Sequence, residues 1–290
     1  MNGFLLIDKP KGKSSADCVY SLRKILNTRK IGHCGTLDPL ATGVLPICIG
    51  EATKFSNYVS DQSKKYEVKV LFGVETDSGD VTGKEISRKS PKVTEEEFKE
   101  VLRSFEGDIK QTPPMYSAIK FQGKPLYKWV REGIYLRRQE RDVSINKIDI
   151  KSFTENKEAV IQVSCSKGTY IRSLVESIGR KINNIATIEE LRRIRVGEFK
   201  EEDLTPLESK EKSFYEEKLM NFDKALNGLP RMLLDNLEVK KIRNGQKLDY
   251  NAREQKEGIV RLYEKEGFFI GLGNIDSSKR VSAKRLLATK

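Results

Sequence analysis

Histidine and cysteine, the side chains that most often hold metals or build nucleophilic triads, are scarce in this sequence. The 290 residues include one histidine, His33, and four cysteines, Cys18, Cys34, Cys48 and Cys165, without a C-x-x-C pair. A structural zinc site requires several clustered thiolate or imidazole ligands. A Ser-His-Asp or H-E-x-x-H scheme would depend on His33 alone. The scarcity argues against these sites, and we expect four reduced, partly buried thiols and no bound metal.

Long apolar runs are also absent. No stretch of the chain approaches the roughly 18 apolar residues that a membrane-spanning helix requires. The N-terminal sequence MNGFLLIDKPKGK carries its apolar residues ahead of its lysines, which is the reverse order of a secretory signal. We therefore expect a cytoplasmic protein with no membrane partner.

Negative charge is in the minority. The chain contains 54 Lys and Arg residues against 42 Asp and Glu residues, which gives a formal net charge of +12. A surplus of this sign favours a polyanionic partner, and nucleic acid before membrane. Hydrophobic residues still make up 37% of the chain, so a sizeable core can form.

Strands are indicated at several places in the first two thirds of the chain. Residues 3–7 form a short apolar run, and apolar side chains alternate with mostly polar ones from Tyr66 to Val74. Residues 143–150 and 159–165 show further strand-like patterns. These segments predict a sheet as the framework of a large domain.

Helical patterns are interleaved with these strands. Ser14 or Ser15 is placed to cap a helix over residues 18–26, and Thr94 with Glu97 forms a capping box ahead of residues 98–105. A turn at residues 167–168 precedes another helical stripe at 171–178. Hairpin-like connections outnumber helical crossovers, so we expect an α+β fold on a largely antiparallel, mixed sheet with flanking helices.

The last fifth of the chain has a different character. A charge-dense stretch at residues 208–220 and the Gly-Leu-Pro sequence at 228–230 precede short strand-like pieces separated by glycines. We therefore expect two domains, a large one over residues 1–228 and a small, basic, β-rich one over residues 229–290.

The most informative segment is GHCGTLDPLATGVLPICIGEATK at residues 32–54. Its four glycines and two prolines, and its lack of helical or strand periodicity, predict that most of it is a loop with special backbone angles. An aspartate before a proline in such a loop is commonly a turn cap. As a whole, however, residues 32–43 resemble the catalytic motif G-H-x-G-x-L-D-P-x-A-x-G of the TruB-type tRNA pseudouridine-55 synthases.

The resemblance extends along the chain in the order of that family. The first motif of that family is similar to LLIDKPKGKSS near the N-terminus. Its later motifs are similar to KKYEV at 64–68, PPMYSAIK at 113–120 and CSKGTYIR at 165–172. IRNGQ at 242–246 is similar to the start of its C-terminal PUA-like domain. The resemblance implies a pseudouridine synthase catalytic domain followed by a PUA-like RNA-binding domain.

The activity implied by the resemblance is isomerisation of uridine to pseudouridine at position 55 in the T-loop of tRNA. A C–N glycosidic bond breaks, the base turns and a C–C bond forms, without redox change or external group, so no cofactor is expected. By resemblance Asp38 is the catalytic carboxylate, either attacking C1′ or taking the 2′ proton. Carboxylates serve elsewhere as covalent catalysts.

The resemblance also assigns roles to four further residues near the base. Arg172 would pair with Asp38, since a guanidinium fork favours and orients the ionised carboxylate. Tyr66 would stack on the target base near C5, and Tyr170 and Leu191 would line the base pocket. Seen singly, each of these residues also suits a packing or solvated role.

Contacts to the RNA complete the expected site. A stacked uridine must be extruded from its loop, and phosphate contacts make binding salt-dependent. Lys9, together with Lys11 and Lys13, is expected to contact RNA phosphates, and His33 to contact the RNA loop beside the flipped nucleotide. The partner is therefore the T-arm of tRNA, bound by a monomer.

Other readings remain open at this stage. A non-catalytic RNA-binding or ribosome-associated protein would explain the charge but would not need Asp38, Tyr66 and Arg172 in their motifs. A glycoside-type hydrolase would pair Asp38 with a second carboxylate. GDVTGK at 79–84 lacks the spacing of a phosphate-binding loop, and Asp77 and Asp80 are expected to lie in a solvated turn.

Overall fold

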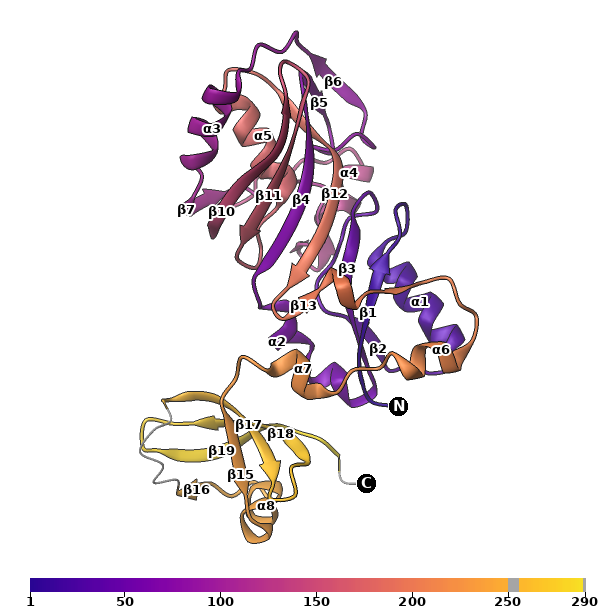
Figure 1. Cartoon of the computed structure of the whole chain (residues 1–290), viewed down its shortest axis with the longest axis vertical. Helices are drawn as coiled ribbons and strands as arrows, with labels where there is room; N and C mark the ends of the chain where they lie inside the picture. The colour runs from indigo at the N-terminus through magenta and orange to yellow at the C-terminus, as the bar shows by residue number, and fades with distance from the viewer. Residues whose placement is uncertain (250–255, 289–290) are drawn as a thin grey trace.

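The computed structural model describes residues 1–249 and 256–288 and contains two domains, the larger above the smaller in Figure 1. Two short parts of the expected C-terminal domain, residues 250–255 and 289–290, lie outside the described residues. No helix among the described residues has the length and apolar character needed to cross a bilayer.

A ten-stranded sheet forms the centre of the larger domain. Its strands are β1 (Gly3–Lys9), β2 (Ile31–His33), β3 (Thr42–Ile49), β4 (Lys64–Phe72), β7 (Gly107–Gln111), β10 (Arg141–Thr154), β11 (Glu158–Cys165), β12 (Ala186–Val196), β13 (Phe199–Lys200) and β14 (Thr205–Pro206). Their main order is β14-β1-β3-β12-β4-β11-β10-β7, with β2 beside β3 and β13 beside β12. Only the β1–β14 and β3–β12 pairs are parallel. The α+β fold on a largely antiparallel, mixed sheet is confirmed.

Helices and two small hairpins surround this sheet (Figure 1). The hairpins are β5 (Val74–Thr76) with β6 (Glu85–Arg88), and β8 (Lys120–Phe121) with β9 (Lys124–Pro125). The helices are α1 (Ser15–Ile25), η1 (Gly50–Phe55), α2 (Ser56–Ser60), α3 (Glu95–Arg103), α4 (Leu126–Arg131), α5 (Ile171–Lys181), η2 (Glu201–Asp203), α6 (Lys212–Glu217) and α7 (Phe222–Leu226).

The predicted helix starts are confirmed. Ser14 caps α1 and forms a capping box with Asp17, and Thr94 forms the expected box with Glu97 at the start of α3. In each box two backbone N–H groups that a helix start leaves unpaired gain side-chain acceptors. These caps fix where the two helices begin against the sheet.

The expectation that residues 32–54 are mostly loop is wrong outside residues 34–41. Seven of the eight β3 residues are buried, because β3 lies between β1 and β12 in the sheet and its side chains join one hydrophobic cluster on each face. A strand buried on both faces shows no alternation of apolar and polar residues. Pro46 has no N–H to donate to a neighbouring strand, but its carbonyl accepts from the Cys34 N–H at 2.8 Å.

The strand predicted from Tyr66 to Val74 is interrupted. Gly73 has a φ of +79°, and a side chain there would meet the Lys89 carbonyl oxygen at 2.4 Å. The chain therefore ends β4 at Phe72 and starts β5 at Val74. This break directs the β5–β6 turn towards α5, where it takes part in the site described below.

The described residues of the smaller domain form a five-stranded sheet with one helix. Its elements are β15 (Arg231–Leu234), α8 (Asn236–Arg243), β16 (Leu248–Asp249), β17 (Gly258–Glu264), β18 (Phe269–Ile275) and β19 (Arg280–Leu286). The strand order is β15-β17-β18-β19-β16. The expected small β-rich domain is therefore present.

Aromatic side chains join the two domains. The ring of Phe269 in β18 lies 5.6 Å from Phe55 of η1 and 5.5 Å from Phe222 of α7. Leu226 and Leu272 belong to the same buried cluster. We call Phe55, Phe222, Leu226, Phe269 and Leu272 the interdomain cluster. The two sheets thus share part of their apolar core.

Candidate active site

The loop of residues 34–41 connects β2 to β3 and is anchored on both sides of Asp38. Before Asp38, the Leu37 N–H donates to the Ser15 hydroxyl at 2.8 Å, and that hydroxyl lies 3.2 Å from the Leu37 carbonyl. After it, the Ala41 N–H donates to the Asp38 carbonyl at 3.0 Å. Leu37 and Ala41 are buried. The backbone therefore fixes the position from which the Asp38 carboxylate projects.

Lys9 is part of this anchoring and is not a surface lysine. Its side chain is fully buried, and its ammonium donates to the carbonyls of Pro10, Lys13 and Pro39 at 2.9, 2.5 and 3.2 Å. All three of its N–H donors thus have backbone acceptors. The expectation that Lys9 contacts RNA phosphates is wrong, because the ends of β1 and the loop enclose it; Lys11 and Lys13 are exposed.

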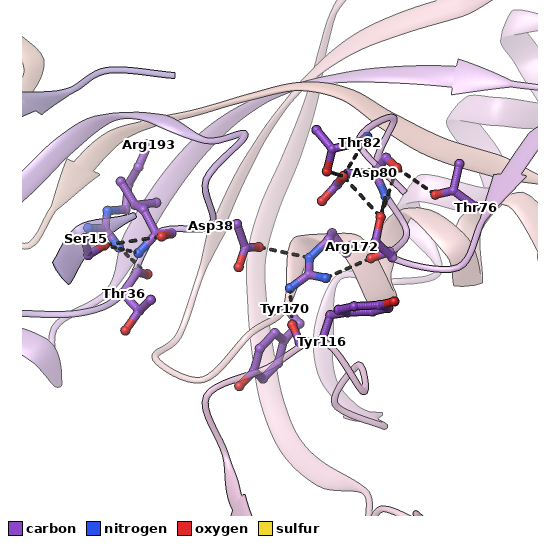
Figure 2. Close-up of polar contacts among 12 residues, drawn as sticks. Ser15, Thr36, Asp38, Thr76, Asp80, Thr82, Tyr116, Tyr170, Arg172 and Arg193 are labelled. Carbon is purple, nitrogen blue, oxygen red and sulfur yellow. Dashed lines mark hydrogen bonds and ion pairs between the residues drawn. The ribbon is translucent and has the colours of Figure 1, made fainter. Parts of the chain in front are cut away.

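Arg172 connects Asp38 to two other segments. Its Nε lies 2.9 Å from Asp38 Oδ2, while its two terminal nitrogens donate to the carbonyls of Ser78 and Tyr116 at 2.8 and 2.7 Å. Figure 2 shows the carboxylate pointing towards this guanidinium. Arg172 is 4% exposed and lies in the first turn of α5. The expected ion pair between Arg172 and Asp38 is present, and the hydrogen bonds to the Ser78 and Tyr116 carbonyls hold its guanidinium in place.

Asp80 lies behind Arg172 and is buried, so the expected solvated turn is wrong for this residue. Its carboxylate accepts from the Thr82 N–H at 3.0 Å and from the hydroxyls of Thr82 and Ser78 at 2.5 and 3.2 Å. The Asp80 carbonyl also accepts from the Thr76 hydroxyl at 2.7 Å. Hydrogen bonds within the β5–β6 turn replace the water that a surface aspartate would bind, and they orient the Ser78 carbonyl that receives Arg172.

Opposing influences act on the Asp38 carboxyl. Burial raises its pKa above the ordinary value, and the negative charge of Asp80 adds to the rise, whereas the charges of Arg172 and Lys9 lower it. The side chain remains 34% exposed. Arg172 is thus the main group that favours the ionised form.

A cavity of about 350 Å³ opens beside Asp38. Asp38, Tyr66, Tyr170, Arg172 and Leu191 all line it. Tyr66 projects from β4, and Leu191 from the neighbouring strand β12, where it is opposite Val68. Burial raises the pKa of the Tyr66 phenol, and the nearby Arg193 guanidinium opposes that rise. Five residues that the sequence placed in one site therefore do surround one space.

Tyr170 is fixed at the start of α5 by its main chain. The Gln111 side-chain amide donates to the Tyr170 carbonyl at 2.9 Å, and its oxygen accepts the Tyr170 N–H at 2.7 Å. The ring is left to line the cavity. Gln111, at the end of β7, was not singled out from the sequence because an isolated glutamine carries no pattern.

His33 is not among the residues that line this cavity. It ends β2 and is partly exposed, and its Nδ1 is buried without a hydrogen-bond partner. Burial lowers the pKa of its imidazole, and the charge of Arg193 lowers it further. The contact between His33 and the RNA loop stays a prediction.

Arg193 was missed by the sequence reasoning although it lines the cavity. It is 1% exposed and donates to the carbonyls of Val44, Thr36 and Gly35 at 2.8, 3.4 and 3.2 Å. Strand alternation puts residues 191 and 193 on one face, so Leu191 was the available signal. The neighbouring arginines at 192 and 195 obscured it.

Comparison with known proteins is consistent with this geometry. A model of the TruB family pseudouridylate synthase N-terminal domain matches residues 23–171. Models described as the tRNA pseudouridylate synthase B C-terminal domain and the pseudouridine synthase II TruB C-terminal region match residues 172–235 and 230–287. The matched segments extend from α1 to the last described strand.

Whole-chain relatives agree with the models. The chain is 40% identical over 292 residues to tRNA pseudouridine synthase B of Aromatoleum aromaticum, with 100% of this chain and 94% of the relative covered. It is 41% identical over 294 residues to the protein of that name from Chromobacterium violaceum, with 100% and 96% covered.

A solved structure has the same fold. A chain in the crystal structure of a Cbf5-Nop10-Gar1 complex superposes with a TM-score of 0.76 at 25% identity, covering 98% of this chain and 84% of that chain. The sequence relatives, the family models and a pocket built around Asp38 and Arg172 lead to one conclusion: the chain belongs to the TruB family of pseudouridylate synthases and is an isomerase.

Proposed function

We propose that this isomerase converts uridine 55 in the T-loop of tRNA into pseudouridine. The observation that carries the proposal is the Asp38 carboxylate, held by Arg172 at the edge of a cavity that two tyrosines and a leucine also line. Relatives about 40% identical over the whole chain are tRNA pseudouridine synthases, which supports tRNA as the substrate.

The target base must leave its stack to reach Asp38. Extruding a nucleotide costs a few kcal/mol, and stacking on an aromatic ring returns roughly 1–3 kcal/mol per base. Tyr66 offers the stacking surface in this proposal, and Tyr170 and Leu191 close the pocket around the base. The buried positions of Tyr66 and Leu191 make the pocket largely preformed.

The ionised Asp38 carboxylate begins the reaction at the sugar. It acts either by attacking C1′ or by taking the 2′ proton, and both routes need the charged form that Arg172 favours. The N1–C1′ bond breaks, the detached uracil turns within the pocket, and C5 bonds to C1′. On the first route the Asp38–C1′ ester breaks as this bond forms, and on the second route Asp38 returns its proton to C2′. Tyr66, as the phenolate, then takes the C5 proton and releases it to water, while N1 gains a proton from water, so the atoms of the base are conserved.

The RNA is held by charges outside the pocket. The net charge of +12, the exposed Lys11 and Lys13, and the basic C-terminal domain support contacts to tRNA phosphates. His33 would touch the RNA loop near the flipped nucleotide. The proposed active unit is a monomer in the cytosol, whose reducing environment suits the four free cysteines.

Nucleotide-resolution mapping of pseudouridine in unmodified tRNA tests the proposal. We expect one new pseudouridine at position 55 with the wild-type protein, and none with Asp38→Asn, which keeps the side-chain size but removes the charge. The variant should still bind tRNA. Conversion by a verified Asp38→Asn protein, or modification at another position only, would contradict the proposal, and binding without conversion by wild type would favour a non-catalytic RNA-binding role.

A further inference from the structure

Arg193 is a buried cation without an ionic partner among residues 1–249 and 256–288. Its guanidinium donates only to main-chain carbonyls, those of Gly35, Thr36 and Val44. Burying a charge without a counter-ion is strongly unfavourable. Carbonyl dipoles offset part of that penalty, and a methionine or leucine could fill the same volume without it. The charge itself therefore needs an explanation.

The explanation lies in what Arg193 faces. It borders the catalytic cavity and is paired directly opposite Tyr66 of β4, so the two side chains share one face of the sheet and the Arg193 charge acts on the Tyr66 hydroxyl. The other ionisable groups that act on this hydroxyl are Cys165 from β11 and Asp38 from the loop, and both raise the pKa of the phenol, whereas Arg193 lowers it. Arg193 is thus the cation placed to stabilise negative charge on the Tyr66 oxygen.

We propose that Arg193 is a positioning residue of the isomerase that holds the Tyr66 oxygen towards the cavity and stabilises it as the phenolate that accepts the C5 proton. The inference rests on the proposed function, since it concerns the last step of that reaction. Figure 2 shows Arg193 beside Thr36, on the side of Asp38 away from Arg172. The two arginines therefore divide the chemistry: Arg172 serves the carboxylate, and Arg193 serves the phenol.

The step in question is proton transfer after the new C–C bond has formed. The C5–H bond breaks, its electron pair returns to the ring, and an O–H bond forms on Tyr66. The proton leaves Tyr66 to water, and Arg193 keeps its charge throughout. A preorganised cation beside the atom where charge resides lowers the barrier of such a step without reorganisation.

A purely structural clamp on the loop would have different consequences. Loss of a clamp would disturb Asp38 and slow glycosidic bond cleavage, which precedes transfer of the C5 proton. Loss of the Arg193 charge that stabilises the Tyr66 phenolate would slow only the proton transfer. Substrate deuterated at C5 of the target uridine separates the two, because an isotope effect appears only when breaking the C5–H bond limits the rate.

The experiment uses full-length protein and a T-arm RNA that carries either uridine or 5-deuterouridine at the target position. Arg193→Met removes the charge, and Arg195→Met is the matched control, because Arg195 lies on the same strand but is exposed. Arg193→Lys retains a buried charge and serves as a second variant if Arg193→Met does not fold. Single-turnover rates are measured from about pH 7 to 9.5, below the ordinary pKa of tyrosine.

We expect Arg193→Met to slow conversion about 100-fold, the usual effect of impairing a general base, and to show a larger deuterium isotope effect than wild type. Its rate should recover as the pH rises. Arg193→Lys should show the same enlarged isotope effect as Arg193→Met, with a smaller loss of conversion rate. Wild-type rates, or slow conversion with an unchanged isotope effect and pH profile, would overturn the inference. An inactive wild type would instead refute the proposed function.

Discussion

Replacing Lys9 with methionine tests how the catalytic loop is held. The buried ammonium donates to three carbonyls, and one of them belongs to Pro39, the residue after Asp38. Methionine has a similar length but no donor. A buried acceptor left unsatisfied costs about 1–3 kcal/mol. The neutral amine has two N–H donors, so at a pH where it is neutral the variant leaves two more acceptors unsatisfied, which destabilises the native state by about 4 kcal/mol.

At lower pH the wild type must bury a charged ammonium at Lys9, and the free-energy cost of doing so offsets part of the stability that its hydrogen bonds provide. Burial lowers the pKa of Lys9 from 10.5 to about 8 in the native state. Between these values the unfolded chain holds a proton that the native state has released, so the stability of the wild type rises with pH. From pH 7 to 10 the gain is about 2.5 kcal/mol. Lys9→Met lacks it, so the deficit of the variant should grow from about 1.5 to about 4 kcal/mol.

Urea unfolding at pH 7, 8, 9 and 10, followed by circular dichroism, measures this difference. Lys11→Met is the matched control, because Lys11 is exposed and two residues away. Both variants are also made with Cys18→Ala, because Lys9 influences the pKa of the Cys18 thiol. Turnover should fall with little change in tRNA affinity, since Pro39 loses a support next to Asp38. A deficit that is independent of pH, or largest at pH 7, would refute the reasoning.

Three further predictions concern the site and the second domain. Arg172→Met removes the charge that opposes the raised pKa of Asp38, so the acid limb of the kcat/KM profile should move to higher pH; an unmoved limb would contradict the ion pair's role. His33→Ala should slow single-turnover conversion or weaken tRNA binding, and His33→Gln should keep the wild-type pH–rate shape from about pH 5.5 to 8; loss of an ionisation step would make His33 an acid–base catalyst. Truncation after Gly228 should weaken tRNA binding, flatten its salt dependence in filter-binding assays and lower the unfolding temperature; unchanged affinity would show that the second domain does not touch tRNA.

Much of the site could be predicted because most of its residues lie in sequence motifs of the family. Asp38 and Arg172 were matched from separate motifs, and the structure joins them at 2.9 Å. What the sequence could not provide was burial. Lys9 resembles its neighbours Lys11 and Lys13 in sequence, and only the path of β1 beside the loop encloses it.

The fold shows the same limit. Amphipathic elements such as α3 and β4 were found because one face of each is buried and periodicity reports that face. β3 was missed because both its faces are covered. Asp80 was misplaced for a related reason, since its partners come from its own turn and the turn is covered by α5, about 90 residues later in the chain. Contacts of this range leave no local pattern.

The interdomain cluster has a consequence for how the protein responds to RNA. Phe55 follows β3 directly through η1 and packs on Phe269 of the other sheet. Breathing motions that expose the amides of β3 to solvent must therefore also separate Phe55 from Phe269. A ligand that contacts both domains binds their joined arrangement more tightly than the separated one and therefore makes those motions rarer. Amide hydrogen exchange in β3, the strand that follows Asp38, should slow when RNA is bound at a surface that this strand never touches.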